Sequence, residues 1–440
     1  MRTLRIAAAL AAVLSTALAG SPAAAQAPRP DGTVPGEVIL QVEAGQSADA
    51  VAATHGLTLL DQFGSRPIWR ARVAPGDKVK PVLADLAADA RVRYAEANVE
   101  HQAPEARHNV VWAIGGSESE WAAQWAPDAL RLDSAHTLAT GAGVRIALLD
   151  TGMDLDHPLL APRLARSAQG VLLGRDFVDA DDHPAEMGSR ADLGYGHGTH
   201  VAGLLALAAP DARLMPARVL NPAGQGNAWV LAEALMWAVD PDGNPRTADG
   251  AHVINMSLGT TRPTRLLDQA VELATCSDDD DGDDDADHDG PGFEADEIRC
   301  DEVGGAVVVS AAGNAASSQQ RQYPAAEQAE GALSVAATDE SDRLAAFSNR
   351  GRWILIAAPG DRIMSTVPQA GWAVWSGTSM AAPLTAGVAA LLRQRYPDWK
   401  PVDVTKRIQD RSAKVCDTWL RQVDAAAALR DQEPPRTRCG

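Results

Sequence analysis

Basic residues are scarce in this chain of 440 residues, which has 39 lysines and arginines against 58 aspartates and glutamates. The formal charge of −19 at pH 7 leaves little basic surface to meet a phosphate backbone, so we expect no nucleic-acid partner. Residues 277–302 alone hold 14 acidic residues against one arginine, which accounts for −13 of that charge. The remainder of the chain is therefore only mildly acidic.

Long hydrophobic runs are also missing, apart from residues 6–19, which form a run that is short for a membrane span. Arg2 and Arg5 precede this run, and three alanines at positions 23–25 follow it as a small-residue cleavage pattern. We interpret residues 1–25 as a signal peptide that is removed. The sequence thus predicts a secreted protein, extracellular or periplasmic, with no membrane partner after cleavage.

Cysteine is rare, with four residues, and no Cys-x-x-Cys pair occurs, which argues against a zinc site. Export to an oxidising compartment would allow disulfides. Four cysteines permit three pairings. The pairing that is local in sequence joins Cys276 to Cys300 and Cys416 to Cys439.

Two kinds of periodicity divide the chain. Residues 35–102 alternate strand-like and helix-like patterns in a small α+β domain, and residues 103–123 have little periodicity and are expected to be an exposed linker. Residues 124–430 alternate apolar strands and helices, with strands expected at 144–149, 212–220, 252–256, 306–310, 333–336 and 353–357. This predicts an α/β fold with a doubly wound, mostly parallel sheet covered by helices on both faces, and ligands beyond the carboxyl ends of its strands.

Ser379 lies in the segment Gly-Thr-Ser-Met-Ala-Ala-Pro at residues 377–383, directly before an apolar helical run. A serine at a helix N-terminus suits a nucleophile, because the first-turn N–H groups and the helix dipole favour an oxyanion there. Taken alone, the same serine could simply cap the helix.

Three further polar residues follow apolar strands or open a helix. Asp150 ends a buried strand, where a carboxylate is costly unless it is hydrogen-bonded, although it could also cap a turn. His197 begins a helix within Gly-His-Gly-Thr-His-Val-Ala-Gly at residues 196–203, and Asn314 ends a strand at Ala-Gly-Asn. The glycines near His197 do not fit a dinucleotide fingerprint, and no His-Glu-x-x-His zinc pattern is present.

Taken together, these segments resemble the subtilisin-like serine proteases, since the blocks around Asp150, His197 and Ser379 occur in that order with their flanking glycines. The resemblance implies that Ser379 is the nucleophile, His197 the general base and Asp150 its orienting partner. It implies that Asn314 and the N–H of Ser379 hold the oxyanion, and that residues 257–259 pair with the substrate backbone. These three residues are Ser257, Leu258 and Gly259. It also implies that residues 35–102 are an inhibitory propeptide domain of ferredoxin-like type.

The acidic insert, residues 277–302, departs from compact members of that family. Asp285, Asp287 and Asp289 match the start of a Ca²⁺ loop, with Asp296 at its twelfth position. Clustered carboxylates repel one another unless a cation neutralises them, and the alternative is a solvated, disordered loop. We therefore expect structural Ca²⁺ with these three aspartates as ligands.

The sequence predicts a secreted serine endopeptidase that cleaves peptide bonds in protein or peptide substrates through an acyl-enzyme. We expect it to be a monomer, made as a self-processed precursor that its own propeptide inhibits. The alternative is a non-catalytic calcium- or protein-binding protein that keeps the protease fold. An esterase is disfavoured, because Ser379 lacks the Gly-x-Ser-x-Gly elbow.

Overall fold

The structure, a computed structural model, describes residues 32–107, 113–277 and 292–435. The expected signal peptide, the calcium candidates Asp285, Asp287 and Asp289, and Cys439 lie outside the described residues. Within the described part of the chain, no helix combines the length and the apolar character that a membrane crossing requires.

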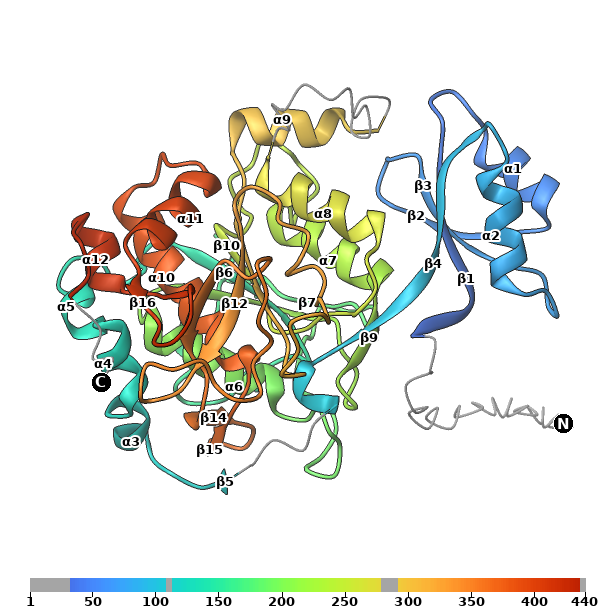
Figure 1. Cartoon of the computed structure of the whole chain (residues 1–440). Helices are drawn as coiled ribbons and strands as arrows, with labels where there is room; N and C mark the ends of the chain where they lie inside the picture. Colours follow the sequence, from blue (N-terminus) through green and yellow to red (C-terminus); the bar gives the residue numbers. More distant parts are fainter. Residues whose placement is uncertain (1–31, 108–112, 278–291, 436–440) are drawn as a thin grey trace, which may run out of the picture.

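A small N-terminal domain stands beside a larger domain (Figure 1). Its elements are β1 (Thr33–Val42), α1 (Ala48–His55), β2 (Thr58–Gln62), β3 (Ile68–Arg72), α2 (Val79–Ala87) and β4 (Val92–Gln102). The strands pair antiparallel in the order β2-β3-β1-β4, which is the ferredoxin-like arrangement that we expected. β2 is an addition to the expected elements, because its residues are half exposed and do not alternate cleanly between apolar and polar.

Both faces of this small sheet are covered. Along β1, Val38 and Leu40 pack into the core beneath α1 and α2, while Ile39 packs against the larger domain. Successive side chains of a strand point to opposite faces, so one strand serves both cores. Figure 1 shows the sheet between its own two helices and the helices α7 (Ala228–Val239) and α8 (Arg265–Thr275) of the larger domain.

The larger domain is built on a sheet of nine strands in the order β16-β17-β13-β12-β11-β10-β6-β8-β7. Every pairing is parallel except that of β16 with β17. The strands are β6 (Arg145–Asp150), β7 (Arg175–Asp176), β8 (Arg213–Arg218), β10 (Val253–Met256), β11 (Val307–Ala311), β12 (Ala332–Thr338), β13 (Ile356–Pro359), β16 (Ala413–Lys414) and β17 (Arg421–Gln422). The expected central strands are therefore present, with slightly different bounds.

Helices cover both faces of this sheet, as predicted. One apolar core joins the sheet to α6 (His197–Ala208), α10 (Thr378–Arg395), α11 (Pro401–Asp410) and α12 (Ala425–Arg430). The other joins the opposite face to α7 and α8. β6 divides its side chains between the two cores, with Ile146 and Leu148 on one side and Ala147 and Leu149 on the other.

Shorter elements complete the described chain. They are a 3₁₀ turn (Pro104–Arg107), β5 (Ala113–Ile114), α3 (Glu118–Ala122), α4 (Trp125–Leu130), α5 (Leu132–His136), a second 3₁₀ turn (Ala161–Arg163), β9 (Gln225–Asn227), α9 (Glu294–Glu302), β14 (Ile363–Val367) and β15 (Gly371–Trp375). β14 and β15 form a hairpin that pairs with β5.

The strand order reverses direction at β6, the first strand of the large sheet. From β6 the chain builds β7 and β8 on one side, and then β10 to β13 on the other. The loops after β6 and β10 therefore separate at the carboxyl edge, where doubly wound sheets bind their ligands. Asp150 ends β6 and Ser257 follows β10 at this point.

The expectation of an exposed linker at residues 103–123 is wrong at both ends. Ala103 and Glu105 are buried in the larger domain, and Trp121 of α3 is buried as well. The cause is that β4 runs on to Gln102 and carries the following residues into the larger domain (Figure 1).

The expected disulfide between Cys276 and Cys300 is present. It joins the residue after α8 to α9, which is the described end of the acidic insert. Asp296 does not serve as the twelfth residue of a calcium loop here, because both of its carboxylate oxygens bind the guanidinium of Arg66.

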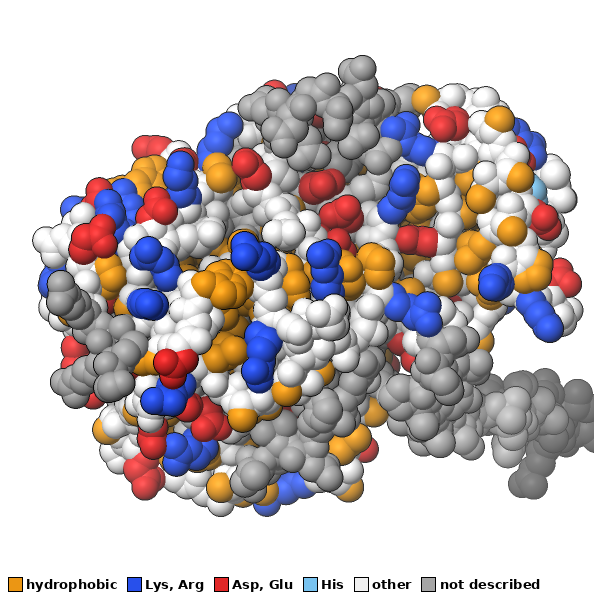
Figure 2. All heavy atoms as spheres, viewed as in Figure 1, with side chains coloured by type: hydrophobic (Ala, Val, Ile, Leu, Met, Phe, Trp, Pro, Cys, Tyr) orange, Lys and Arg blue, Asp and Glu red, His pale blue; other side chains and the backbone are white. Residues whose placement is uncertain are grey.

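Charged side chains of both signs are mixed on the face shown in Figure 2. Lysine and arginine side chains are dispersed among acidic ones and do not merge into one basic patch. This face offers no feature that favours a polyanion as a partner.

Candidate active site

Asp150 ends β6 with its side chain fully buried. Its Oδ1 accepts a hydrogen bond from the N–H of Thr151 at 2.7 Å and lies 2.7 Å from Nδ1 of His197. A carboxylate in this position keeps the imidazole in one orientation and stabilises its protonated form.

His197 is the first residue of α6, and the first turn of this helix approaches the loop after β6 very closely. A Cβ added to Gly198 would lie 1.9 Å from the carbonyl oxygen of Gly152, so only glycine permits this approach. Gly196, at the cap position, has φ of +87°, which also favours glycine. These glycines explain how His197 and Asp150 come within hydrogen-bond distance.

Ser379 is the second residue of α10 and is fully buried. Its hydroxyl lies 3.2 Å from the carbonyl oxygen of Ser257, and the Ser257 hydroxyl in turn donates to the carbonyl oxygen of Ser379 at 2.9 Å. The start of α10 is thus tied to the segment after β10. The serine occupies the helix N-terminus that the sequence predicted.

Asn314 follows β11, and its amide is oriented by Thr378 of α10. The Asn314 Oδ1 accepts hydrogen bonds from both the N–H and the hydroxyl of Thr378, each at 2.9 Å. With the oxygen held in this way, the NH₂ group is left to donate, and it donates to an oxygen of Glu105. The sequence did not point to Thr378 as its orienting partner.

Glu105, from the N-terminal segment, occupies the centre of this site. Its Oε2 accepts a hydrogen bond from the Ser379 hydroxyl at 2.7 Å and lies 3.1 Å from Nε2 of His197. Its Oε1 accepts a hydrogen bond from the Asn314 amide at 2.8 Å. Sequence reasoning missed Glu105, because nothing in the local pattern of the supposed linker indicated burial.

Two buried carboxylates hold the proton of His197. Burial by itself lowers the pKa of His197, but the charges and hydrogen bonds of Asp150 and Glu105 outweigh it and raise that pKa to about 10. Burial likewise favours a raised pKa for Glu105, yet its bonds to His197, Ser379 and Asn314 bring that pKa below its ordinary value. These two carboxylates therefore favour the imidazolium form of His197, and an imidazolium does not accept a proton from a serine hydroxyl.

The segment before Glu105 runs through the site as an added strand. Residues 100–102 pair antiparallel with β9 on one side, and on the other side Gln102 and Gly259 exchange two backbone hydrogen bonds of 2.9 and 3.0 Å. Gly259, which directly follows Ser257 and Leu258, thus pairs with an extended peptide, as a residue of a substrate-binding segment would. At Pro104 the chain turns into the 3₁₀ helix, so a side chain, and not a backbone carbonyl, reaches Ser379.

Glu186 is a further group that the sequence did not suggest. Its Oε2 accepts hydrogen bonds from the N–H and the hydroxyl of Thr199 at 3.1 and 2.9 Å, in the first turn of the helix that carries His197. Burial, with the nearby charge of Asp150, raises the pKa of Glu186 to about 8. Glu186 thereby ties the loop before α6 to the helix start.

A metal site is not evident among the described residues. The carboxylates of Asp240, Asp242 and Asp249 lie within 4.8 Å of one another, but they are partly or fully exposed and nothing else at that place indicates a ligand. The aspartates that the sequence favoured for calcium, Asp285, Asp287 and Asp289, fall outside the described chain.

A serine at a helix N-terminus, an aspartate–histidine pair and an amide donor define the site of a serine hydrolase. Residues 141–431 match the subtilase family, and residues 20–98 match the fervidolysin N-terminal prodomain. The chain belongs to the subtilase family and is a serine-type endopeptidase with an N-terminal prodomain.

The chain is similar to several named proteases. M-protease from Shouchella clausii is 30% identical over 409 residues, which cover 90% of this chain and 88% of that protein. Thermitase from Thermoactinomyces vulgaris is 36% identical over 279 residues, which cover 61% of this chain and 81% of that protein.

The fold likeness extends to solved structures. Fervidolysin from Fervidobacterium pennivorans superposes with a TM-score of 0.67 at 22% identity, over 92% of this chain and 62% of the fervidolysin chain. A protease from Pseudoalteromonas arctica gives a TM-score of 0.56 at 26% identity, over 72% of this chain and 99% of its own. The predicted subtilisin-like fold is thus confirmed.

Proposed function

We propose that Ser379 is the nucleophile of this endopeptidase, with His197 as general base and acid and Asp150 as its orienting partner. The contacts of the Glu105 carboxylate support this assignment most directly. One of its oxygens touches both Ser379 and His197, and the other touches Asn314. A carboxylate held in this way occupies the space that a reacting carbonyl group and its oxyanion require.

In catalysis, His197 Nε2 takes the proton of Ser379 as its Oγ forms a bond to the substrate carbonyl carbon. The Asn314 NH₂ group and the N–H groups at the start of α10 stabilise the negative charge that moves onto the carbonyl oxygen. When the C–N bond breaks, His197 returns the proton to the leaving amine, and an ester on Ser379 remains. Water, activated by the same imidazole, then releases the acid.

Protein or peptide segments in extended conformation are the proposed substrates. β9 and the segment of Ser257, Leu258 and Gly259 would pair with the substrate from its two sides, because β9 pairs with residues 100–102 and Gly259 pairs with Gln102 in this way. These hydrogen bonds join backbone groups, so substrates of many different sequences can form them.

The N-terminal domain is proposed to inhibit the enzyme in the precursor, which then cleaves itself. Two features of Glu105 support inhibition. Its carboxylate fills the position of the oxyanion, and its negative charge keeps His197 protonated. We assign residues 35–102 to this domain, residues 103–123 to a connecting segment and residues 124–430 to the catalytic domain, with the acidic insert at 277–302.

We further propose that the protein is secreted as a monomer and binds structural Ca²⁺. The predicted signal peptide at residues 1–25 supports export, and the disulfide between Cys276 and Cys300 suits an oxidising compartment. The run of nine aspartates between positions 278 and 289, with Asp285, Asp287 and Asp289 in calcium-loop spacing, supports the ion.

Hydrolysis of casein by the purified, processed protein tests the proposed function. We expect cleavage that a serine-directed fluorophosphonate blocks, with the label on Ser379. Processed protein that binds casein without cutting it would favour the non-catalytic alternative. Cleavage that persists after Ser379 is labelled would contradict the assignment of the nucleophile.

A further inference from the structure

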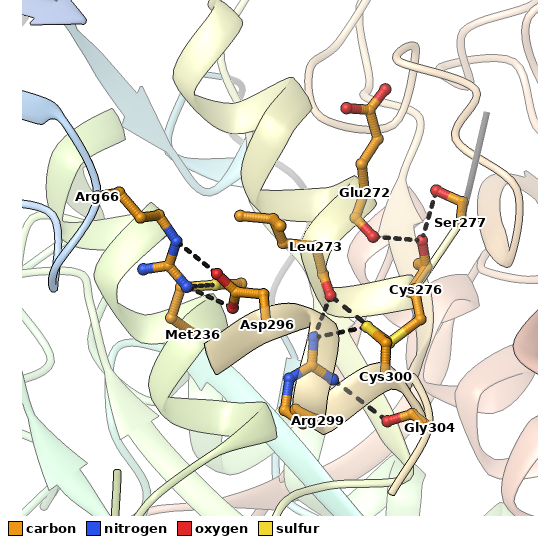
Figure 3. The surroundings of a disulfide bond; sticks show 11 residues. Arg66, Met236, Glu272, Leu273, Cys276, Ser277, Asp296, Arg299, Cys300 and Gly304 are labelled. Carbon is orange, nitrogen blue, oxygen red and sulfur yellow. Dashed lines mark hydrogen bonds and ion pairs between the residues drawn. A yellow bond between two sulfur atoms is a disulfide. The ribbon is translucent and has the colours of Figure 1, made fainter. Parts of the chain in front are cut away.

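Helix α9 of the acidic insert is held firmly against α8 (Figure 3). The disulfide joins Cys300 of α9 to Cys276, which follows the last residue of α8. The Arg299 guanidinium donates to the carbonyl oxygen of Leu273 in α8 and to that of Gly304 at 3.2 Å. These bonds fix the orientation of α9, and with it the position of Asp296 one turn earlier.

Asp296 receives an arginine from the N-terminal domain. Arg66, in the loop between β2 and β3, donates from Nε at 2.9 Å and from a terminal nitrogen at 2.5 Å to the two carboxylate oxygens (Figure 3). The two residues are 8% and 7% exposed, so the pair is shielded from water. A two-point bond of this kind fits the planar fork of arginine and not the single ammonium of lysine.

The residues next to Arg66 also contact the larger domain. The neighbouring Ser65 hydroxyl donates to the carbonyl oxygen of Gly292 at 3.1 Å, just before α9. The guanidinium lies over the ring of Phe63, 4.7 Å from its centroid. Phe63 in turn meets Trp229 of α7 edge to face, with ring centroids 5.9 Å apart. The hairpin loop at residues 63–66 therefore contacts both α7 and the insert.

We propose that helix α9, held by the Cys276–Cys300 disulfide, is a docking site for the N-terminal domain, and that it recognises an arginine at the tip of a hairpin loop. Its occupant is residues 63–66 of the same polypeptide, both before and after the connecting segment is cut. This rests on the proposed function of the N-terminal domain as the inhibitor. The described part of the insert thus controls how long the inhibitor stays bound.

The charges of Arg66 and Asp296 explain why this ion pair affects dissociation of the N-terminal domain. Once the N-terminal domain leaves, Asp296 loses both of its bonds to Arg66 and must be hydrated. A buried charge pair that loses one partner is strongly destabilised, whereas loss of both partners costs less. Removal of one partner should therefore weaken docking much more than removal of an exposed arginine on the same sheet.

The test uses a cut but inactive full chain, in which Ser379→Ala prevents proteolysis and a recognition site for a sequence-specific protease replaces residues 108–112. After cutting, size-exclusion chromatography over a dilution series gives the dissociation constant of the two pieces. We expect Arg66→Ala and Asp296→Asn each to raise this constant about a hundredfold or more, and Arg66→Lys to give a smaller increase.

The matched control is Arg72→Ala. Arg72 is an exposed residue of β3 whose bond, at 3.1 Å, goes to Glu37 of the same domain. We expect its dissociation constant to stay within about threefold of the parent. The double variant Arg66→Ala/Asp296→Asn should lose less binding free energy than the sum of the losses in the two single variants, because the two side chains interact directly.

Thermal unfolding of each uncut chain shows whether a variant still folds. Folded Arg66→Ala and Asp296→Asn chains that dissociate at the parental concentration would overturn the proposal. Because no step needs catalysis, weaker docking in these variants would support it even if the active chain failed to hydrolyse casein. In that case the proposed function alone would fail.

Discussion

The carboxylate of Glu105 accepts a hydrogen bond from the hydroxyl of Ser379 at 2.7 Å, although 274 positions separate the two residues in the chain. The same oxygen lies 3.1 Å from Nε2 of His197, so the proposed nucleophile and the proposed base meet at one atom of the connecting segment. Because the Ser379 hydroxyl donates its hydrogen to Glu105, it does not donate that hydrogen to His197. This single contact links the proposed inhibition to the proposed catalytic chemistry.

Glu105→Gln should make the uncut precursor more reactive. The neutral amide no longer stabilises the imidazolium, so the pKa of His197 falls and more of it is free to act as a base. Each unit of pKa changes the neutral fraction about tenfold, so we expect labelling by a fluorophosphonate at least about tenfold faster at neutral pH. Labelling is measured at early times, with a gel to show that the chain is uncut.

Glu118→Gln is the control for that experiment. Glu118 is an exposed carboxylate of α3 that the structure does not bring to Ser379. Its replacement should leave the labelling rate unchanged. Equal labelling of the Glu105→Gln and parental precursors would show that the carboxylate does not inhibit the site.

Ser379→Ala should abolish proteolysis and leave the precursor uncut when it is produced without other proteases. The reason is that peptide cleavage and self-processing would use the same hydroxyl. Electrophoresis and N-terminal sequencing of the purified chain provide the measurement. Normal maturation of this variant would contradict self-processing, even if casein hydrolysis were lost.

Asn314→Ala should lower kcat by about 100- to 1000-fold while KM changes little. This is the size of loss known for removal of the equivalent donor from a subtilisin, and we adopt it for this site. The amide acts on charge that develops only in the transition state, so binding of the ground state is mostly spared. Steady-state kinetics of processed enzyme on a peptide substrate provides the test. A rise in KM as large as the fall in kcat would contradict the assignment.

Rising pH should weaken docking of the N-terminal domain, because it removes the proton from Glu96. The carboxylate of this residue accepts the N–H groups of Arg265 and Leu266 at 2.9 and 3.1 Å, at the start of α8. Burial nevertheless raises its pKa to about 7. Because the docked state binds the proton more tightly than the free domain, this stabilisation is complete at low pH and is lost as the pH rises through 7.

We expect the dissociation constant of the cut complex to increase about tenfold between pH 6 and pH 8.5. Glu327, whose pKa is raised to about 8 by burial and by nearby carboxylates that include Glu96, should act in the same direction. In Glu96→Gln the pH dependence should shrink, because the amide can still accept the two N–H groups but does not titrate. An identical pH profile for parent and variant would rule out Glu96 as its source.

Calcium should stabilise the processed enzyme, with a melting temperature that rises on addition of the ion and falls with a chelator. If the ion binds only the folded state, a free concentration a hundredfold above the dissociation constant adds about 2.7 kcal/mol of stability. The measurement compares the parent with Asp285→Asn/Asp287→Asn/Asp289→Asn, since calcium could also bind elsewhere. An unchanged calcium response in this triple variant would exclude the insert as the site.

The sequence by itself determined the larger part of the fold. Strands such as β6 and β11 are mostly apolar runs, and α7 directly follows an asparagine whose side chain caps it, so local residue types were enough. The positions of Asp150, His197, Asn314 and Ser379 followed in the same way, since each stands where a strand ends or a helix begins. Glycines around them indicated close approach between loops.

Only the tertiary structure decided what fills the site and what holds the prodomain. Glu105 lies in a segment without periodicity, and its burial depends on β9 and Gly259, which are more than a hundred residues away and pair with the strand before it. Asp296 looked like a calcium ligand until Arg66 was found 230 positions away in sequence and bound to it. Local patterns report secondary structure because its hydrogen bonds are local. A carboxylate's partner is set by which distant surfaces pack together.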